Sequence, residues 1–149
     1  MLEYNSELCT LQNGESGLPM ECKVFWRLMH RVANRAALDT CVARTLPLLA
    51  GPCHVRDSKR YWKIPELWES NVETTISQGS TAEQVLSCLV MAYNLATGWN
   101  ILGSLSASSA HGFTGVFALG KTGQSNVVGL EWASFDLVSG DSAAVLSST

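Results

Sequence analysis

Apolar residues recur every three or four positions through much of the first hundred residues, which is the spacing of a helix face. The first helix predicted by this spacing begins near Pro19, and its apolar face consists of Phe25, Leu28, Met29, Val32 and Ala36. Asp39 suits the N-cap of a short helix over 40–49, and Pro65 suits the first turn of another that ends near Gln78. The pattern therefore predicts three helices before residue 79.

The clearest local signal is the sequence Ser80-Thr-Ala-Glu83, which has the form of a capping box. In that motif the serine hydroxyl and the glutamate carboxylate each satisfy a free backbone amide at the start of a helix. The residues that follow, as far as Gly98, are apolar around most of a helical circumference. We therefore expect this helix to lie at the centre of the core.

Beyond Gly98 the helical period disappears, and glycine and serine separate several apolar runs. These runs predict strands at 99–106, 113–119 and 127–138, with a turn around 121–126 between the last two. In the third strand Phe135 and Leu137 are out of phase with the earlier apolar residues, which indicates a bulge near Ala133 unless both faces are covered. The predicted fold is α+β, with several N-terminal helices packed on a three-stranded C-terminal antiparallel sheet.

The length of 149 residues is typical of a single domain, which we assign to 1–149. Turn dipeptides and few apolar residues predict a loosely packed arm over 1–18, and small polar residues predict a frayed tail over 139–149. Five cysteines without a CxxC pair, and a start without a secretory leader pattern, favour a cytoplasmic protein with reduced thiols. No apolar segment has the length of a membrane span. Because charged residues make up only 15% of the chain, a buried contact with a partner or a second copy is plausible.

Charge is distributed very unevenly along the chain. Residues 1–22 hold four acidic residues and no base, residues 23–63 hold nine of the ten lysines and arginines with two acidic residues, and residues 64–149 hold one base and seven acidic residues. The net charge of −3 therefore conceals a strongly basic segment. A partner responds to this local charge rather than to the total.

Four bases on the first predicted helix, Lys23, Arg27, Arg31 and Arg35, are spaced four residues apart and form a stripe opposite its apolar face. A solvated helix face, or pairing with the acidic remainder of the chain, would explain this stripe without a binding role. The lack of glutamate four residues before or after each base favours an anionic partner instead.

A second basic cluster interleaves bases with aromatic residues, at Arg56, Lys59, Arg60, Tyr61, Trp62 and Lys63. Protein interaction hot spots and single-stranded nucleic-acid sites both have this composition. The structural alternative is a loop in which Trp62 fills the core and the bases are solvated. No spacing typical of an RNA-binding or zinc-finger motif accompanies the cluster.

Candidate catalytic chemistry is weak. Cys53 and His54 are an adjacent thiol and imidazole with Asp57 nearby, but adjacent residues on a loop rarely orient toward each other. The glycine-containing segment 111–115 lacks the spacing of a phosphate-binding loop, and the histidines and cysteines lack zinc-site spacing. We therefore predict no catalytic residue, no metal and no cofactor.

The hypothesis that these observations favour is a non-enzymatic binding protein. It would be a small inhibitor, immunity or adaptor protein of a bacterium or phage that blocks or bridges a protein partner, with Trp62 as a buried anchor. The predicted contact residues are Lys23, Arg27, Arg31, Arg35, Arg56, Lys59, Arg60, Trp62 and Lys63. Nucleic acid or a nucleotide, bound by the same residues, is the alternative partner. The third hypothesis is a small Cys/His enzyme, in which His54 or His111 would have to approach a cysteine.

Overall fold

The computed structural model describes residues 21–77, 79–103, 113–120 and 123–139. Within them lie two α-helices, α2 (Arg35–Thr45) and α3 (Thr81–Leu95), and a short 3-10 helix, η1 (Leu46–Leu49). The strands are β1 (Cys22–Arg31), β2 (Cys53–Arg60), β3 (Leu67–Ile76), β4 (Asn100–Leu102), β5 (Phe113–Ala118) and β6 (Leu130–Ser139). The predicted arm over 1–18 lies outside the described residues, as does the predicted tail after Ser139.

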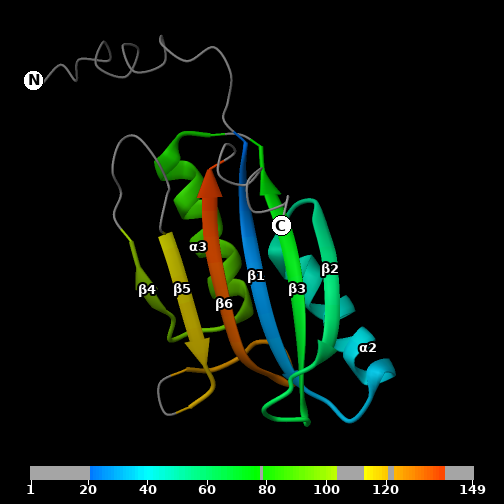
Figure 1. Cartoon of the computed structure of the whole chain (residues 1–149). Coiled ribbons are helices and arrows are strands. Elements are labelled where there is room, and N and C mark those ends of the chain that lie inside the picture. The colour runs from blue at the N-terminus through cyan, green and yellow to red at the C-terminus, as the bar shows by residue number, and fades with distance from the viewer. Residues whose placement is uncertain (1–20, 78, 104–112, 121–122, 140–149) are drawn as a thin grey trace, which may run out of the picture.

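The six strands form one antiparallel sheet in the order β2-β3-β1-β6-β5-β4 (Figure 1). The chain runs from β1 through α2 to β2, and β3 then inserts between those two strands. It runs from β3 through α3 and the β4–β5 hairpin to β6, which lies on the other side of β1. Both helices cover the same face of the sheet (Figure 1). The opposite face has no helix across it among the described elements.

The prediction of several N-terminal helices on a three-stranded sheet is wrong, because two of the predicted helices are the strands β1 and β3. The error has a simple geometric origin. Residues four positions apart share a side of a helix, but they also share a side of a strand, where side chains alternate with a period of two. In β1 the alternation is complete from Cys22 to Leu28: Val24 and Trp26 face the core, and Lys23 and Phe25 lie on the other face.

The start of β3 shows a related ambiguity. Pro65, expected in the first turn of a helix, lies instead in a tight turn in which the Leu67 amide donates to the Ile64 carbonyl at 2.9 Å. Both positions require the backbone φ angle near −65° that proline imposes, so proline alone does not distinguish them. After the turn Trp68, Val72 and Ile76, spaced four apart, all face the core.

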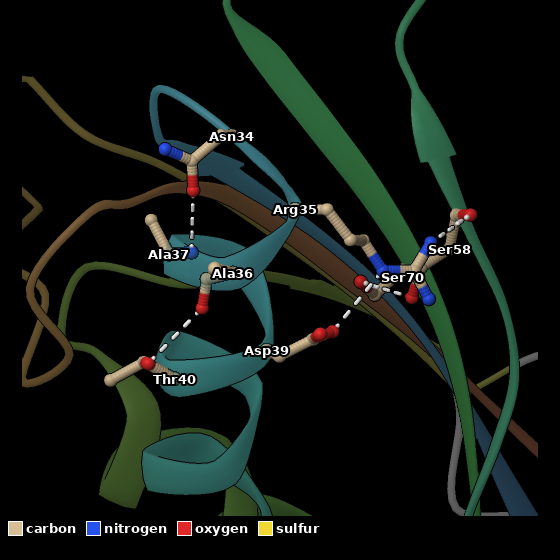
Figure 2. Close-up of polar contacts among 8 residues, drawn as sticks. All are labelled: Asn34, Arg35, Ala36, Ala37, Asp39, Thr40, Ser58 and Ser70. Atoms are coloured by element: carbon tan, nitrogen blue, oxygen red, sulfur yellow. Dashed lines mark hydrogen bonds and ion pairs between the residues drawn. The ribbon is translucent and has the colours of Figure 1, made fainter.

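The second predicted helix begins earlier than expected. The N-cap of α2 is Asn34 rather than Asp39, and its side-chain oxygen accepts a hydrogen bond of 2.9 Å from the Ala37 amide (Figure 2). Asp39 lies inside the helix, and Pro47 lies in η1, where the helix tightens. Asparagine and aspartate are both good N-cap residues, so the sequence alone did not distinguish Asn34 from Asp39 as the start of the helix.

The C-terminal half follows the sequence pattern closely. The side chain of Ser80 accepts a hydrogen bond from the Glu83 amide and begins α3, and strands occur in all three predicted C-terminal segments. The predicted bulge lies two residues from Ala133: Met29 pairs with Trp132 and His30 pairs with Leu130, which leaves Glu131 as the extra residue. The bulge brings Leu130 to the same side as Phe135 and Leu137.

An aromatic cluster fills the core between α3 and the sheet. Trp26, Trp99 and Phe135 lie with ring centroids 5.4–6.3 Å apart, and Phe117 contacts Trp99 at 5.8 Å. The Trp99 indole nitrogen donates to the carbonyls of Ala92 and Ala96, each at 2.9 Å. This contact ties the C-terminal end of α3 to the segment that leads into β4.

Candidate interaction surface

The first predicted basic stripe lies on a strand rather than a helix. Lys23 and Arg27 project from β1 onto the sheet face that carries no helix, and each forms an ion pair with a diagonal neighbour on β3. Lys23 Nζ lies 2.5 Å from Glu73 Oε1, and Arg27 Nε lies 3.0 Å from Glu69 Oε1. The hydrogen bond that Arg27 donates to Glu69 raises the pKa of the guanidinium above its usual value.

The other two bases of the stripe are paired as well. Arg31 meets Glu131 at the β6 bulge through two hydrogen bonds of 2.5 and 3.1 Å, which raise the pKa of the guanidinium. Arg35 lies 3.2 Å from Asp39 on α2 and donates to the Ser58 carbonyl on β2 at 3.3 Å (Figure 2). Pairing with acidic residues of the same chain therefore accounts for all four bases, although a binding role for them stays a prediction.

The second basic cluster differs in this respect. Cys53–Arg60, expected as a loop, is the strand β2 at one edge of the sheet, and the bases lie along it and on the loop that follows. Over the part of the chain that the structure describes, ion pairs join other bases to carboxylates, but none involves Arg56, Lys59, Arg60 or Lys63. We call these four residues and Trp62 the hairpin surface. It wraps the edge of the sheet, because Lys59 pairs with Glu69 on the uncovered face and Arg60 pairs with Trp68 on the face that the helices cover.

Aromatic rings, rather than carboxylates, position three of these bases. The guanidinium of Arg60 lies 4.9 Å from the ring centroid of Trp68, and that of Arg56 lies 5.8 Å from Phe25. Lys63 Nζ lies 5.0 Å from the ring of Trp62. A cation over a ring keeps its full charge and its outward-facing donors, so these contacts order the bases without neutralising them.

Trp62 itself is 80% exposed, so the alternative in which it fills the core is wrong. Its loop is closed at the base by a hydrogen bond of 2.8 Å from the Tyr61 amide to the Leu67 carbonyl, and the turn at Pro65 shortens it further. Tyr61 packs beside the indole with ring centroids 6.3 Å apart. A tryptophan side chain is seldom this exposed to solvent. An exposed indole on a loop held by hydrogen bonds is typical of a residue that contacts a partner.

A cleft of about 390 Å³ adjoins this loop, lined by Arg31, Val32, Ala33, Arg60, Pro65 and Glu66. It separates the β2–β3 loop from the turn that joins β1 to α2. The cleft adds concave surface beside the projecting Trp62.

Sequence reasoning missed the residues that arrange the bases. Glu69, Trp68 and Phe25 lie on strands that were expected to be helices, so their relation to the bases was hidden. Trp132 was missed too: Arg27 lies 5.5 Å from its ring centroid and 5.9 Å from that of Tyr61. Recognition of the strand alternation in 22–31 would have indicated these cross-strand neighbours.

The candidate Cys/His chemistry has little support from geometry. Cys53 and His54 are consecutive on a strand, so their side chains point to opposite faces. The Cys53 thiol lies within 3.8 Å of the carbonyls of Leu46, Leu49 and Gly51, and burial raises its pKa, which disfavours thiolate. His111 lies outside the described residues. Among those described, no three histidine, cysteine or acidic side chains are grouped to hold a metal ion.

Neither helix in the described part of the chain has the length and hydrophobicity needed to cross a membrane. Comparisons with protein-family models, with curated protein sequences and with solved structures found no match to this chain.

Proposed function

We propose that this chain is a non-enzymatic binding protein that attaches to an acidic surface of another protein through the hairpin surface. The observation that carries the proposal is the 80% exposure of Trp62 on a closed loop among bases that lack carboxylate partners in the described residues. In this account the protein acts by occupying its partner's surface, as an inhibitor, immunity or adaptor protein does.

Three features support a protein partner. Tryptophan and arginine dominate protein hot spots, because the indole buries a large area and the guanidinium offers paired donors to carboxylates. The stacked arginines are held in place before binding, which lowers the entropy cost of ordering them. The bases also give the surface a positive field that attracts acidic partners and discourages basic ones.

The test begins with affinity capture of partners by the tagged full chain, followed by binding measurements on the purified partner. Replacement of Trp62 by alanine should weaken binding by about 30-fold or more, the loss expected for a hot-spot residue. The Arg60→Gln/Lys63→Gln variant should weaken binding chiefly by slowing association at low salt. Arg44→Gln is the control, because Arg44 lies in the last turn of α2, outside the hairpin surface and the predicted contact residues, so its replacement should change the affinity little. Equal affinity of the Trp62→Ala variant and the wild type would refute the proposal.

Nucleic acid remains the competing partner, because exposed aromatic and basic side chains also serve single-stranded nucleic acid. Titration of labelled single-stranded and duplex oligonucleotides at low and moderate salt separates the two partners. Binding with a steep loss of affinity as salt rises would favour nucleic acid.

We also propose a cytoplasmic location. The free thiols of Cys22, Cys41, Cys53 and Cys88 support it, since reducing compartments preserve thiols. Alkylation in lysed cells followed by mass spectrometry tests this, and a disulfide among these cysteines in the native protein would contradict it.

A further inference from the structure

His30 is a buried imidazole beneath α2, and its hydrogen bonds fix which ring nitrogen carries the proton. The Thr45 hydroxyl donates to the Cys41 carbonyl at 2.8 Å, so its oxygen is left to accept from His30 Nε2, which lies 3.4 Å away. Nδ1 is then the unprotonated nitrogen, and it is buried without a hydrogen-bond partner among the described residues. A second proton on the ring would therefore create an N–H group without an acceptor.

No carboxylate faces the ring from the described elements packed around it, and burial is the one cause of the shift in its pKa. Trp68 lies opposite His30 on β3, and its indole nitrogen, which can only donate, is itself buried without a partner. Leu130 lies opposite on β6, and the β2 residue that pairs with Trp68 is a base, Arg60. The charged residues of α2 are all exposed, namely Arg35, Asp39 and Arg44. A protonated His30 would thus be a buried cation without a counter-ion, which is strongly unfavourable.

Of the elements around His30, α2 is the one that the sheet does not hold by backbone hydrogen bonds. Its buried residues are Leu38, Val42 and Thr45. The first two pack on Trp68 in a small cluster separate from the main core. The Cys41 thiol adds one weak contact, 3.6 Å from the Val128 carbonyl oxygen. Release of α2 would therefore hydrate His30 while exposing far less apolar surface than separation of the strands.

We propose that α2 is an acid-sensitive cover, which leaves the sheet when His30 takes up a proton while the strands and α3 stay folded. The release also alters the hairpin surface. Trp68, which holds the Arg60 guanidinium, loses its packing against α2, and the Ser58 carbonyl loses its hydrogen bond from Arg35 (Figure 2). A partner should then bind more weakly in acid. That last step rests on the proposed function, whereas the release itself does not.

Amide hydrogen exchange of the full chain, corrected for intrinsic exchange rates, measures the release. Between about pH 7.5 and about pH 5, the protection of the buried α2 amides should fall about 30-fold, because the pKa of His30 is about 4 when buried and about 6.5 when hydrated. Exchange in α2 should depend little on added urea, and exchange in α3 strongly, since global unfolding exposes more surface. One protection value and one urea dependence shared by α2 and α3 would overturn the proposal.

The His30→Gln variant should lose the fall in protection, because glutamine does not titrate. His54→Gln is the matched control, since it makes the same substitution at an exposed histidine on β2 and should behave as the wild type does. Thr45→Val, which removes the hydroxyl that His30 contacts, should lower the protection of α2 at both pH values and keep the fall, so it tests the proposal even if His30→Gln does not fold. Equal falls in His30→Gln and the wild type would overturn the proposal. These measurements need no partner, so they fail independently of the Trp62→Ala test of partner binding.

Discussion

Arg27 on β1 and Glu69 on β3 form an ion pair, in which Arg27 Nη2 donates a hydrogen bond of 3.1 Å to Glu69 Oε2 and Nε lies 3.0 Å from Oε1. Their side chains lie diagonally across these two neighbouring strands, and Lys23 and Glu73 repeat the arrangement four residues away. The Glu69 side chain is only 9% exposed, whereas that of Arg27 is 42% exposed. Glu69 therefore depends on Arg27 to compensate its loss of hydration.

Replacement of Arg27 by glutamine should lower the free energy of unfolding by about 1–2 kcal/mol, because it leaves a shielded carboxylate without its main partner. Urea unfolding at neutral pH measures this change. Glu69→Gln in the same chain should recover part of the loss. Strictly additive effects of the two substitutions would show that the pair does not couple. As a control, Asp39→Asn breaks an exposed pair within α2 and should cost about 0.5 kcal/mol or less.

Gly115 on β5 pairs with Phe135 on β6, and the phenyl ring covers the position where a side chain would begin. A Cβ atom at Gly115 would lie 2.2 Å from Cε1 of Phe135, so Gly115→Ala must displace a fully buried ring. We expect a loss of roughly 1–3 kcal/mol in the free energy of unfolding. Gly120→Ala is the control, since its nearest neighbour, the Ala118 carbonyl oxygen, is 4.0 Å away. Equal stability of the two variants would contradict the steric explanation.

His30 is fully buried between the sheet and α2, with Nε2 3.4 Å from the Thr45 hydroxyl, and burial lowers its pKa to about 4. In the unfolded chain the pKa of histidine is about 6.5, so between these values the unfolded state binds a proton that the folded state does not. The free energy of unfolding should therefore fall as the pH drops from about 6.5 to about 4, by about 3 kcal/mol in all. At higher pH this contribution is constant.

The His30→Gln variant isolates this effect, because glutamine does not titrate. The free energy of unfolding is measured against pH for both proteins, and the variant's curve is subtracted from that of the wild type. The subtraction cancels the contribution of the carboxyl groups common to both, including Asp136, whose pKa is raised by burial. The difference in the free energy of unfolding should change with pH only between about pH 4 and about pH 6.5. Parallel profiles would show that His30 does not contribute to acid sensitivity.

The cysteines should differ widely in reactivity. Cys22 and Cys88 are buried, and desolvation raises the pKa of Cys22 to about 11 and that of Cys88 further, so both stay as thiols. Cys41 is partly exposed. Timed alkylation of the folded protein, read by peptide mass spectrometry, should modify Cys41 before Cys22, and Cys88 only as the protein unfolds. Alkylation of Cys88 as fast as Cys41 would mean that α3 separates readily from the sheet.

Some features of this protein follow from the sequence alone because their causes are local. The start of α3 depends on Ser80 and Glu83, which lie within one turn of each other. The C-terminal strands are separated by frequent glycine and serine, which mark breaks without reference to the rest of the fold. The segregation of bases into 23–63 and the aromatic character of the second cluster are also evident in the sequence.

Only the tertiary structure decided that 22–31 and 67–76 are strands, and which bases keep a free charge. A spacing of four residues fits both a helix face and a strand face, and the hydrogen bonds that distinguish them come from distant partners. Arg27 and Glu69 are 42 positions apart, and Lys23 and Glu73 are 50 apart. No local pattern brings such residues together. The sheet does so, and it pairs the first set of bases with carboxylates while it leaves Trp62 and the bases around it at the edge.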